Sequence, residues 1–235
     1  MLLRTFGLAS LLLALLAAPA SAHFVWITID KDSGGQPQLQ VHFSELAEPD
    51  SADLLDRVSA IEVWTRPAGE QPAKLKLSKQ ITDSVGSWVA PVAADTQAAS
   101  GSIKYGVLER GGQTFLLWYH AKFIDATANL KGLGPDKGLA LDIVPQVAEK
   151  GYTLEVAFKG KPVAGSEVVV LDPEGNESTA KTDEAGRVSI AGSKPGVYSI
   201  RAKWTLAEAG KEGDKAYPQV NHYCTLALRV PQPVK

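Results

Sequence analysis

Short segments in which apolar and polar residues alternate make up most of the chain after residue 22. Examples are 23–30 (HFVWITID), 39–45 (LQVHFSE) and 113–124 (QTFLLWYHAKFI), and clusters of Gly, Pro, Asp and Asn separate such segments. This pattern is typical of β-strands joined by turns. One exception is 52–58 (ADLLDRV), where the preceding Asp50 and Ser51 are capping candidates for a short helix. The sequence therefore predicts an all-β protein.

The spacing of the strands changes near residue 146 and divides the chain into two predicted β-sandwich units. After Val147, turn sequences recur at regular intervals, at Lys161-Pro162, 172–175 (DPEG), 183–186 (DEAG) and 194–196 (KPG). Such regular turns are typical of a small β-sandwich. We therefore expect an N-terminal β domain over 23–145 and an immunoglobulin-like sandwich over 146–235. Residues 207–220 are expected to form a loop before the last strand.

Residues 1–22 have the features of a secretory signal peptide. Arg4 precedes the apolar run 6–18, and Ala20 and Ala22 form the small-x-small pattern that signal peptidase accepts. No later segment approaches the ~20 consecutive apolar residues of a transmembrane helix. We therefore expect cleavage after Ala22, a periplasmic location and a mature chain with no transmembrane segment.

The composition excludes several kinds of partner and site. The 24 basic and 26 acidic residues are interspersed and give a net charge of −2, so nucleic acid is not an expected partner. No Gly-rich phosphate loop precedes a helix, and no Gly-x-Ser-x-Gly motif occurs. Cys224 is the only cysteine and Met1 the only methionine, which excludes an internal disulfide, a thiolate zinc site and a Met-rich copper carrier. A metal site here would have to use nitrogen and oxygen ligands.

The chain has four histidines, and the alternation of side chains along a strand predicts where each one points. His23 and His222 each share a strand face with aliphatic residues and should lie at the rim of an apolar face. His120 lies in a strand that is apolar on both faces, and core packing is its simplest role. His42 shares a face with polar residues and Glu45 follows shortly after it, so the simplest interpretation of both is a solvated surface.

His23 differs from the others because cleavage after Ala22 would make it the first residue of the mature chain. Its free α-amine and its imidazole could then chelate one metal ion together, with a second histidine completing a set of three nitrogen ligands. Nitrogen ligands in tetragonal geometry suit Cu(II) or Ni(II). Binding should weaken at low pH, because the amine and the imidazoles must be deprotonated to bind.

Several motifs together resemble a known bacterial family. The segments 22–27 (AHFVWI), 41–45 (VHFSE), 105–122 (YGVLERGGQTFLLWYHAK) and 221–230 (NHYCTLALRV) are similar to exported proteins of unknown function, often labelled as periplasmic nickel or cobalt uptake components of the NikM type. The resemblance implies metal capture at the Ala-His start, which corresponds to Ala22-His23, and a histidine in the closing strand, His222. It also implies a membrane transporter component as a partner, although this chain has no attached permease.

The C-terminal half carries a second resemblance. Gly160, Pro162, Gly165 and Val168 are followed by Thr182, Asp183 and Gly186, and then by Pro195, Gly196 and Tyr198. This order resembles the immunoglobulin-like modules of the carboxypeptidase-regulatory type. The resemblance implies a fold and says little about function, because such sandwiches host many roles.

The sequence leaves three functional hypotheses. The first is a periplasmic protein that binds copper, nickel or cobalt through His23, with His222 as the second ligand and His120, His42 or Glu45 completing the site. The second is a cell-envelope or carbohydrate-binding module without metal, whose five tryptophans would form one exposed contact surface. The third is an enzyme, a copper monooxygenase acting on polysaccharide through the same N-terminal chelate.

Overall fold

The computed structural model describes residues 23–66, 72–127, 130, 133–190 and 194–232. Strands dominate these residues, which confirms the all-β prediction, and residues 52–58 form a 3-10 helix, η1 (Ala52–Val58). The Ser51 hydroxyl caps that helix by accepting a hydrogen bond from the Asp53 amide, as the sequence predicted. The predicted signal peptide lies outside the described residues. Within the described part of the chain, no helix is long and apolar enough to cross a membrane.

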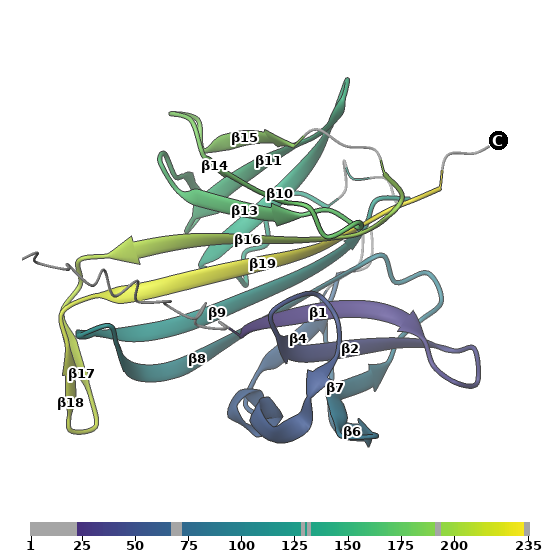
Figure 1. Cartoon of the computed structure of the whole chain (residues 1–235), viewed down its shortest axis with the longest axis horizontal. Helices are drawn as coiled ribbons and strands as arrows, with labels where there is room; N and C mark the ends of the chain where they lie inside the picture. The colour runs from purple at the N-terminus through teal and green to yellow at the C-terminus, as the bar shows by residue number, and fades with distance from the viewer. Residues whose placement is uncertain (1–22, 67–71, 128–129, 131–132, 191–193, 233–235) are drawn as a thin grey trace, which may run out of the picture.

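An eight-stranded sheet forms the centre of the molecule (Figure 1). Its strands follow the order β14 (Glu177–Lys181), β13 (Glu167–Leu171), β16 (Gly196–Leu206), β19 (Val220–Val230), β9 (Gln113–Asp125), β8 (Ala98–Arg110), β4 (Glu62–Thr65) and β5 (Ala73–Lys74). The closing strand β19 runs parallel to β9, whereas the other pairs in this sheet are antiparallel. This parallel pair joins strands from both predicted units into one continuous sheet.

A second sheet covers one face of the central sheet. It consists of β1 (Phe24–Lys31), β2 (Pro37–Ser44), β7 (Val85–Pro91), β3 (Asp50–Ser51) and β6 (Ser78–Thr82). The hydrophobic core on this side of the central sheet contains Val25, Trp26, Ile27 and Phe123, all fully buried. Burying side chains of this size contributes about 1.5–3 kcal/mol each, and this core fixes the position of β1.

A third sheet covers the opposite face of the central sheet (Figure 1). It contains β10 (Leu141–Ala148), β11 (Gly151–Phe158), β12 (Lys161–Pro162) and β15 (Arg187–Ile190). Its core joins Ile143, Leu154 and Val156 to Ile200 and Leu226 of the central sheet. The molecule is therefore a β-sandwich of three layers with two hydrophobic cores.

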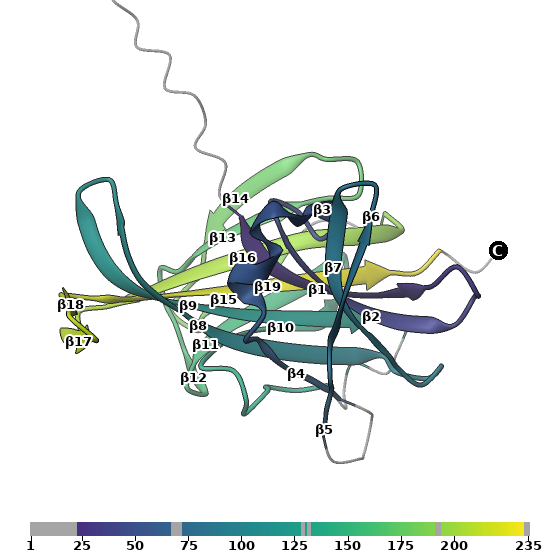
Figure 2. The same ribbon diagram turned by 90° about the horizontal axis from the view of Figure 1, so that it is seen from below.

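The segment expected as a loop before the last strand contains a small hairpin instead. β17 (Gly210–Glu212) pairs with β18 (Lys215–Tyr217), and Lys104 of β8 forms an ion pair of 2.7 Å with Glu212. The sequence pattern missed these strands because each has only three residues. Figure 2 shows this hairpin at the end of the central sheet that extends past the two covering sheets.

Alternation along β9 sends neighbouring side chains into different cores. Tyr119 and Phe123 belong to the core beneath β1, whereas Ile124 belongs to the core beneath β10. His120 and Lys122 share the face of Ile124, because side chains two residues apart in a strand point the same way. The side chains of Tyr119 and His120 therefore lie on opposite faces of the central sheet, and the sheet separates their contacts.

Candidate metal-binding residues

His23 lies directly before β1, where three contacts hold it in place. Its carbonyl oxygen accepts a hydrogen bond of 3.0 Å from the Tyr119 hydroxyl. Its ring packs against Phe43 with 5.5 Å between centroids. Its Nε2 atom lies 3.5 Å from Oδ2 of Asp50, and 23% of the His23 side chain is exposed. The imidazole is therefore positioned by the fold and still open to solvent.

Two carboxylates lie at the same end of the β1–β2 pair as His23. Phe24 pairs with Ser44, so Glu45 follows β2 by one residue at the point where His23 precedes β1. Asp50 belongs to β3, which pairs with β7 and not with β1 or β2. From its sequence position Asp50 is only a capping candidate, because its approach to His23 depends on the strand order in the sheet.

His120 and His222 form the closest pair among the predicted ligands. Nε2 of His120 lies 3.0 Å from Nδ1 of His222, and Nδ1 of His120 lies 3.0 Å from Oγ of Ser102. The parallel pairing of β9 and β19 places His222 opposite Trp118, two residues before His120. His120 is 1% exposed, as its expected core packing requires, and His222, which was expected at a rim, is also buried at 6% exposed.

Burial keeps these two imidazoles uncharged at neutral pH. It lowers the pKa of His120 to about 3, with a further contribution from His222. It lowers the pKa of His222 to about 4, assisted by the positive charge of Lys159. A neutral imidazole keeps one nitrogen lone pair free, and this is the form that binds metal ions.

The structure does not bring His23 together with His120 and His222. The His23 carbonyl contacts Tyr119 on one face of the central sheet, and His120 points to the other face beside Tyr119 in the chain. The predicted ligands therefore divide into His23 with Glu45 and, separately, His120 with His222. Asp50, which was not a predicted ligand, lies beside His23 and is counted below with the His23 group. Among the residues that the structure describes, no group of three or more His, Cys, Asp or Glu side chains has the arrangement of a preformed metal site.

His42 belongs to neither group, and its expected solvated position is wrong. Its side chain is fully buried, with Nε2 2.9 Å from the Thr28 hydroxyl and Nδ1 2.8 Å from the Ser87 hydroxyl. Burial lowers the pKa of His42 to about 4. Both ring nitrogens are occupied within the protein by hydroxyl groups of β1 and β7, so the strand face that the sequence pattern assigned to solvent is buried here.

The five tryptophans do not form a common surface. Trp26 is fully buried and the other four are half-buried, with Trp118 and Trp204 on either side of His222 in neighbouring strands. Trp64 donates to Asp136 and Trp88 donates to the Leu55 carbonyl, while Trp118 lies against the two buried histidines. Their positions are those of packing residues.

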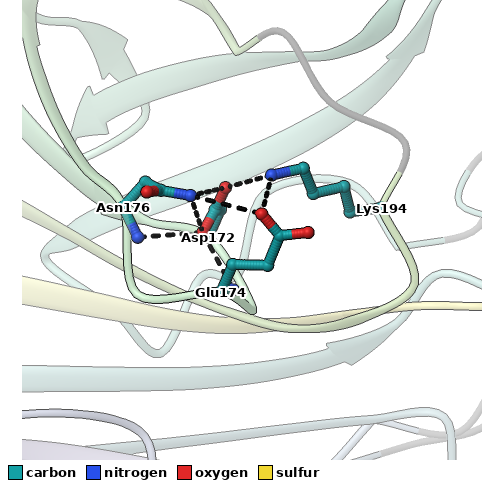
Figure 3. A network of polar contacts seen from close by, with 4 residues as sticks. All are labelled: Asp172, Glu174, Asn176 and Lys194. Carbon is teal, nitrogen blue, oxygen red and sulfur yellow. Dashed lines mark hydrogen bonds and ion pairs between the residues drawn. The ribbon is translucent and has the colours of Figure 1, made fainter.

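A cluster of polar side chains closes the β13–β14 hairpin (Figure 3). Lys194 Nζ lies 3.0 Å from Oδ2 of Asp172 and also pairs with Glu174. Asn176 donates to both oxygens of Asp172, and these hydrogen bonds hold the pKa of Asp172 well below its usual range. Because Lys194 pairs with both carboxylates and Asn176 also binds Asp172, this cluster stabilises the turn and offers no open cation site.

Comparison with known proteins assigns the chain to a family. No curated protein matches it. A family model described as "Domain of unknown function (DUF4198)" matches residues 20–206, which is most of the chain and includes every residue of the His23 group and His120. The protein therefore belongs to the DUF4198 family.

Proposed function

We propose that the mature protein is an exported, periplasmic protein that binds a transition metal ion, with His23 as its principal chelator after cleavage behind Ala22. The observation that carries this proposal is the approach of the His23 imidazole to the Asp50 carboxylate, with 3.5 Å between Nε2 and Oδ2 at a solvent-accessible edge. A nitrogen ligand and an anionic oxygen ligand already face each other there.

The chemistry of this group suits copper, nickel or cobalt. The α-amine and imidazole of His23 would supply two nitrogen donors, and Asp50 would supply an oxygen donor or orient the imidazole. Glu45 follows β2 at the same end of the β1–β2 pair. Nitrogen and carboxylate donors without sulfur favour Cu(II) or Ni(II) among divalent ions. This ligand set replaces the earlier expectation that His222 completes the site.

The resemblance to periplasmic nickel and cobalt uptake components supports a role in metal capture and delivery, with a membrane transporter component as the partner. The resemblance of the C-terminal half to carboxypeptidase-regulatory modules supports a scaffolding role for that half. In this proposal the C-terminal strands complete the central sheet and hold Tyr119, which in turn holds the His23 carbonyl.

The test is calorimetric titration of Cu(II), Ni(II) and Co(II) into protein whose first residue is His23. The matched control carries one glycine ahead of His23, which keeps the imidazole and displaces the amine. We expect tight binding of one ion per chain to the mature form and a loss of at least ~100-fold in the control. This loss exceeds the ~10–100-fold effects of changing residues that only hydrogen-bond to a ligand. Asp50→Asn should weaken binding by ~10-fold. Equal affinity in the mature and extended forms would overturn the proposal.

The same preparation tests the two other hypotheses. A copper monooxygenase would consume dioxygen in the presence of copper and a reductant. A carbohydrate-binding module would retain polysaccharide with no metal present. None of the five tryptophans is exposed, which gives no support to a carbohydrate-binding surface made of tryptophans.

A further inference from the structure

The His120–His222 pair is a second polar site that the proposed function does not use. It lies on the opposite face of the central sheet from His23, beside the fully buried Cys224 and Leu226 of β19. Burying polar rings in an apolar core is costly unless their nitrogens have partners. Three of the four ring nitrogens have partners in the structure, namely each other and the Ser102 hydroxyl.

We infer that His120 and His222 form a two-coordinate binding site for a soft monovalent cation, Cu(I) or Ag(I), through Nε2 of His120 and Nδ1 of His222. The ion would replace the hydrogen bond between the two rings. This inference does not depend on the proposed site at His23.

The hydrogen-bond partners of the pair fit this role. If the ring proton of His120 lies on Nδ1, it is donated to Ser102 Oγ, 3.0 Å away, and the lone pair of Nε2 then faces His222. Metal-binding histidines usually donate their second ring N–H to a neighbouring acceptor in this way. If the ring proton of His222 lies on Nε2, its Nδ1 lone pair faces His120. Binding therefore requires a tautomer change, in which the proton of the hydrogen bond between the rings moves to the other nitrogen of its own ring. Both rings would then bind while neutral, with no net loss of a proton.

The geometry needs one adjustment, which favours two-coordinate binding. Metal–nitrogen bonds of about 2.0 Å place two nitrogens about 4 Å apart in a linear arrangement, whereas they are 3.0 Å apart in the unbound pair. His222 must therefore move outward by about 1 Å. It is the more exposed of the two rings, and its neighbour Phe158, with centroids 5.0 Å apart, is only half-buried.

The surroundings of the His120–His222 pair favour a monovalent cation over a divalent one. The cost of removing an ion from water rises steeply with its charge, and within the described part of the chain no third His, Cys, Asp or Glu completes a site with this pair. The Trp118 ring plane lies within 7° of His120 and 16° of His222. An aromatic face of this kind can also stabilise a nearby cation.

Lys159 opposes cation binding and provides a sensitive test. Its positive charge acts on His222, where it contributes to the low pKa of that ring. Lys159 is exposed, so Lys159→Gln should not disturb the core. We expect this change to tighten Ag(I) binding by about 2- to 5-fold, as for removal of one screened surface charge.

The experiment uses Ag(I), which does not change oxidation state, and the full mature chain with one glycine ahead of His23. This extension displaces the His23 amine and so disables the proposed His23 site. The failure of one proposal can therefore be distinguished from the failure of the other. Native mass spectrometry gives the number of ions bound, and ¹⁵N NMR of the imidazoles identifies the nitrogens. We expect one Ag(I) per chain, with shifts at His120 Nε2 and His222 Nδ1 and unchanged signals for His23 and His42.

Variants separate the pair from other ligands. His120→Gln and His222→Gln should each lower the affinity by more than ~100-fold, and His42→Gln, a matched change of a buried histidine, should leave it unaltered. If a variant does not fold, the imidazole ¹⁵N shifts of the protein without histidine substitutions still identify the nitrogens that bind Ag(I). Three results would each overturn the inference. They are shifts at other histidines, no binding of Ag(I), and binding that is lost in Cys224→Ser but kept in His120→Gln.

Discussion

The hydroxyl of Tyr119 donates a 3.0 Å hydrogen bond to the backbone carbonyl of His23, a residue 96 positions earlier in the chain. Tyr119 is buried in an aromatic cluster that includes Phe24, Phe43, Tyr105 and Tyr223. This bond attaches the first residue of the predicted mature chain to the middle of the central sheet. The position of His23 therefore depends on a residue of the central sheet as well as on β1.

Replacing Tyr119 by phenylalanine tests the importance of this bond. Tyr119→Phe keeps the ring and leaves the His23 carbonyl without its partner, and we expect a loss of about 0.5–1.5 kcal/mol in the free energy of unfolding. Urea denaturation followed by tryptophan fluorescence measures it. Tyr223→Phe, in the same cluster, is the matched control. A Tyr119→Phe protein as stable as the parent would show that this bond contributes nothing.

His42 should make stability depend on pH. Its folded pKa of about 4 lies below its ordinary value of 6.5, so between these values the unfolded chain binds a proton that the folded chain excludes. Its contribution is therefore complete above pH 6.5 and falls as pH drops toward 4, by up to about 1.4 kcal/mol per pH unit. Denaturation curves at pH 7, 6 and 5 should show a shallower decline in His42→Gln than in the parent. Parallel declines would contradict this assignment.

Lys122 and Asp142 form an ion pair that is buried between the central sheet and β10. Lys122 is fully buried, donates to the Ile143 carbonyl at 3.1 Å and contacts Asp142. Asp142 also accepts from the Asp136 amide at 2.8 Å. Lys122→Met should destabilise the protein by about 3–5 kcal/mol, because it leaves a buried carboxylate without its counter-ion.

The double variant Lys122→Met/Asp142→Leu separates charge from packing. It removes both charges, so we expect it to cost less than the sum of the two single changes. Thermal unfolding of the four proteins in this cycle gives the coupling energy. Strict additivity would mean that the two charges do not interact.

Cys224 should be unreactive in the folded protein. It is fully buried, and burial raises the pKa of its thiol far above the usual range, whereas thiol reagents attack the thiolate. A chromogenic disulfide reagent should modify it only as fast as the protein unfolds, and at once in denaturant. Leu226→Ala, which loosens the same core, should accelerate the reaction. Rapid modification of the native parent would be inconsistent with the buried position.

The strand pattern of this protein could be predicted because it is local. Alternating residues, turn clusters and the Ser51 cap are features of neighbouring positions, and they identified the strands and the short helix. Alternation failed at His42, since it shows which residues share a face and does not show what covers that face. It also failed at residues 210–217, where each strand has three residues.

The sequence by itself determined that the chain forms a disulfide-free β-sandwich in which a metal site would have to rely on nitrogen and oxygen ligands. Only the tertiary structure decided which of these ligands meet. The parallel pairing of β9 with β19 brings His120 to His222 across 102 residues, and the strand order brings Asp50 to His23. Such pairings depend on how the two cores pack, and a strand pattern with a period of two residues carries no information about its partner strand. The same period placed Tyr119 and His120 on opposite faces of one sheet, and this separated the predicted ligands into two groups.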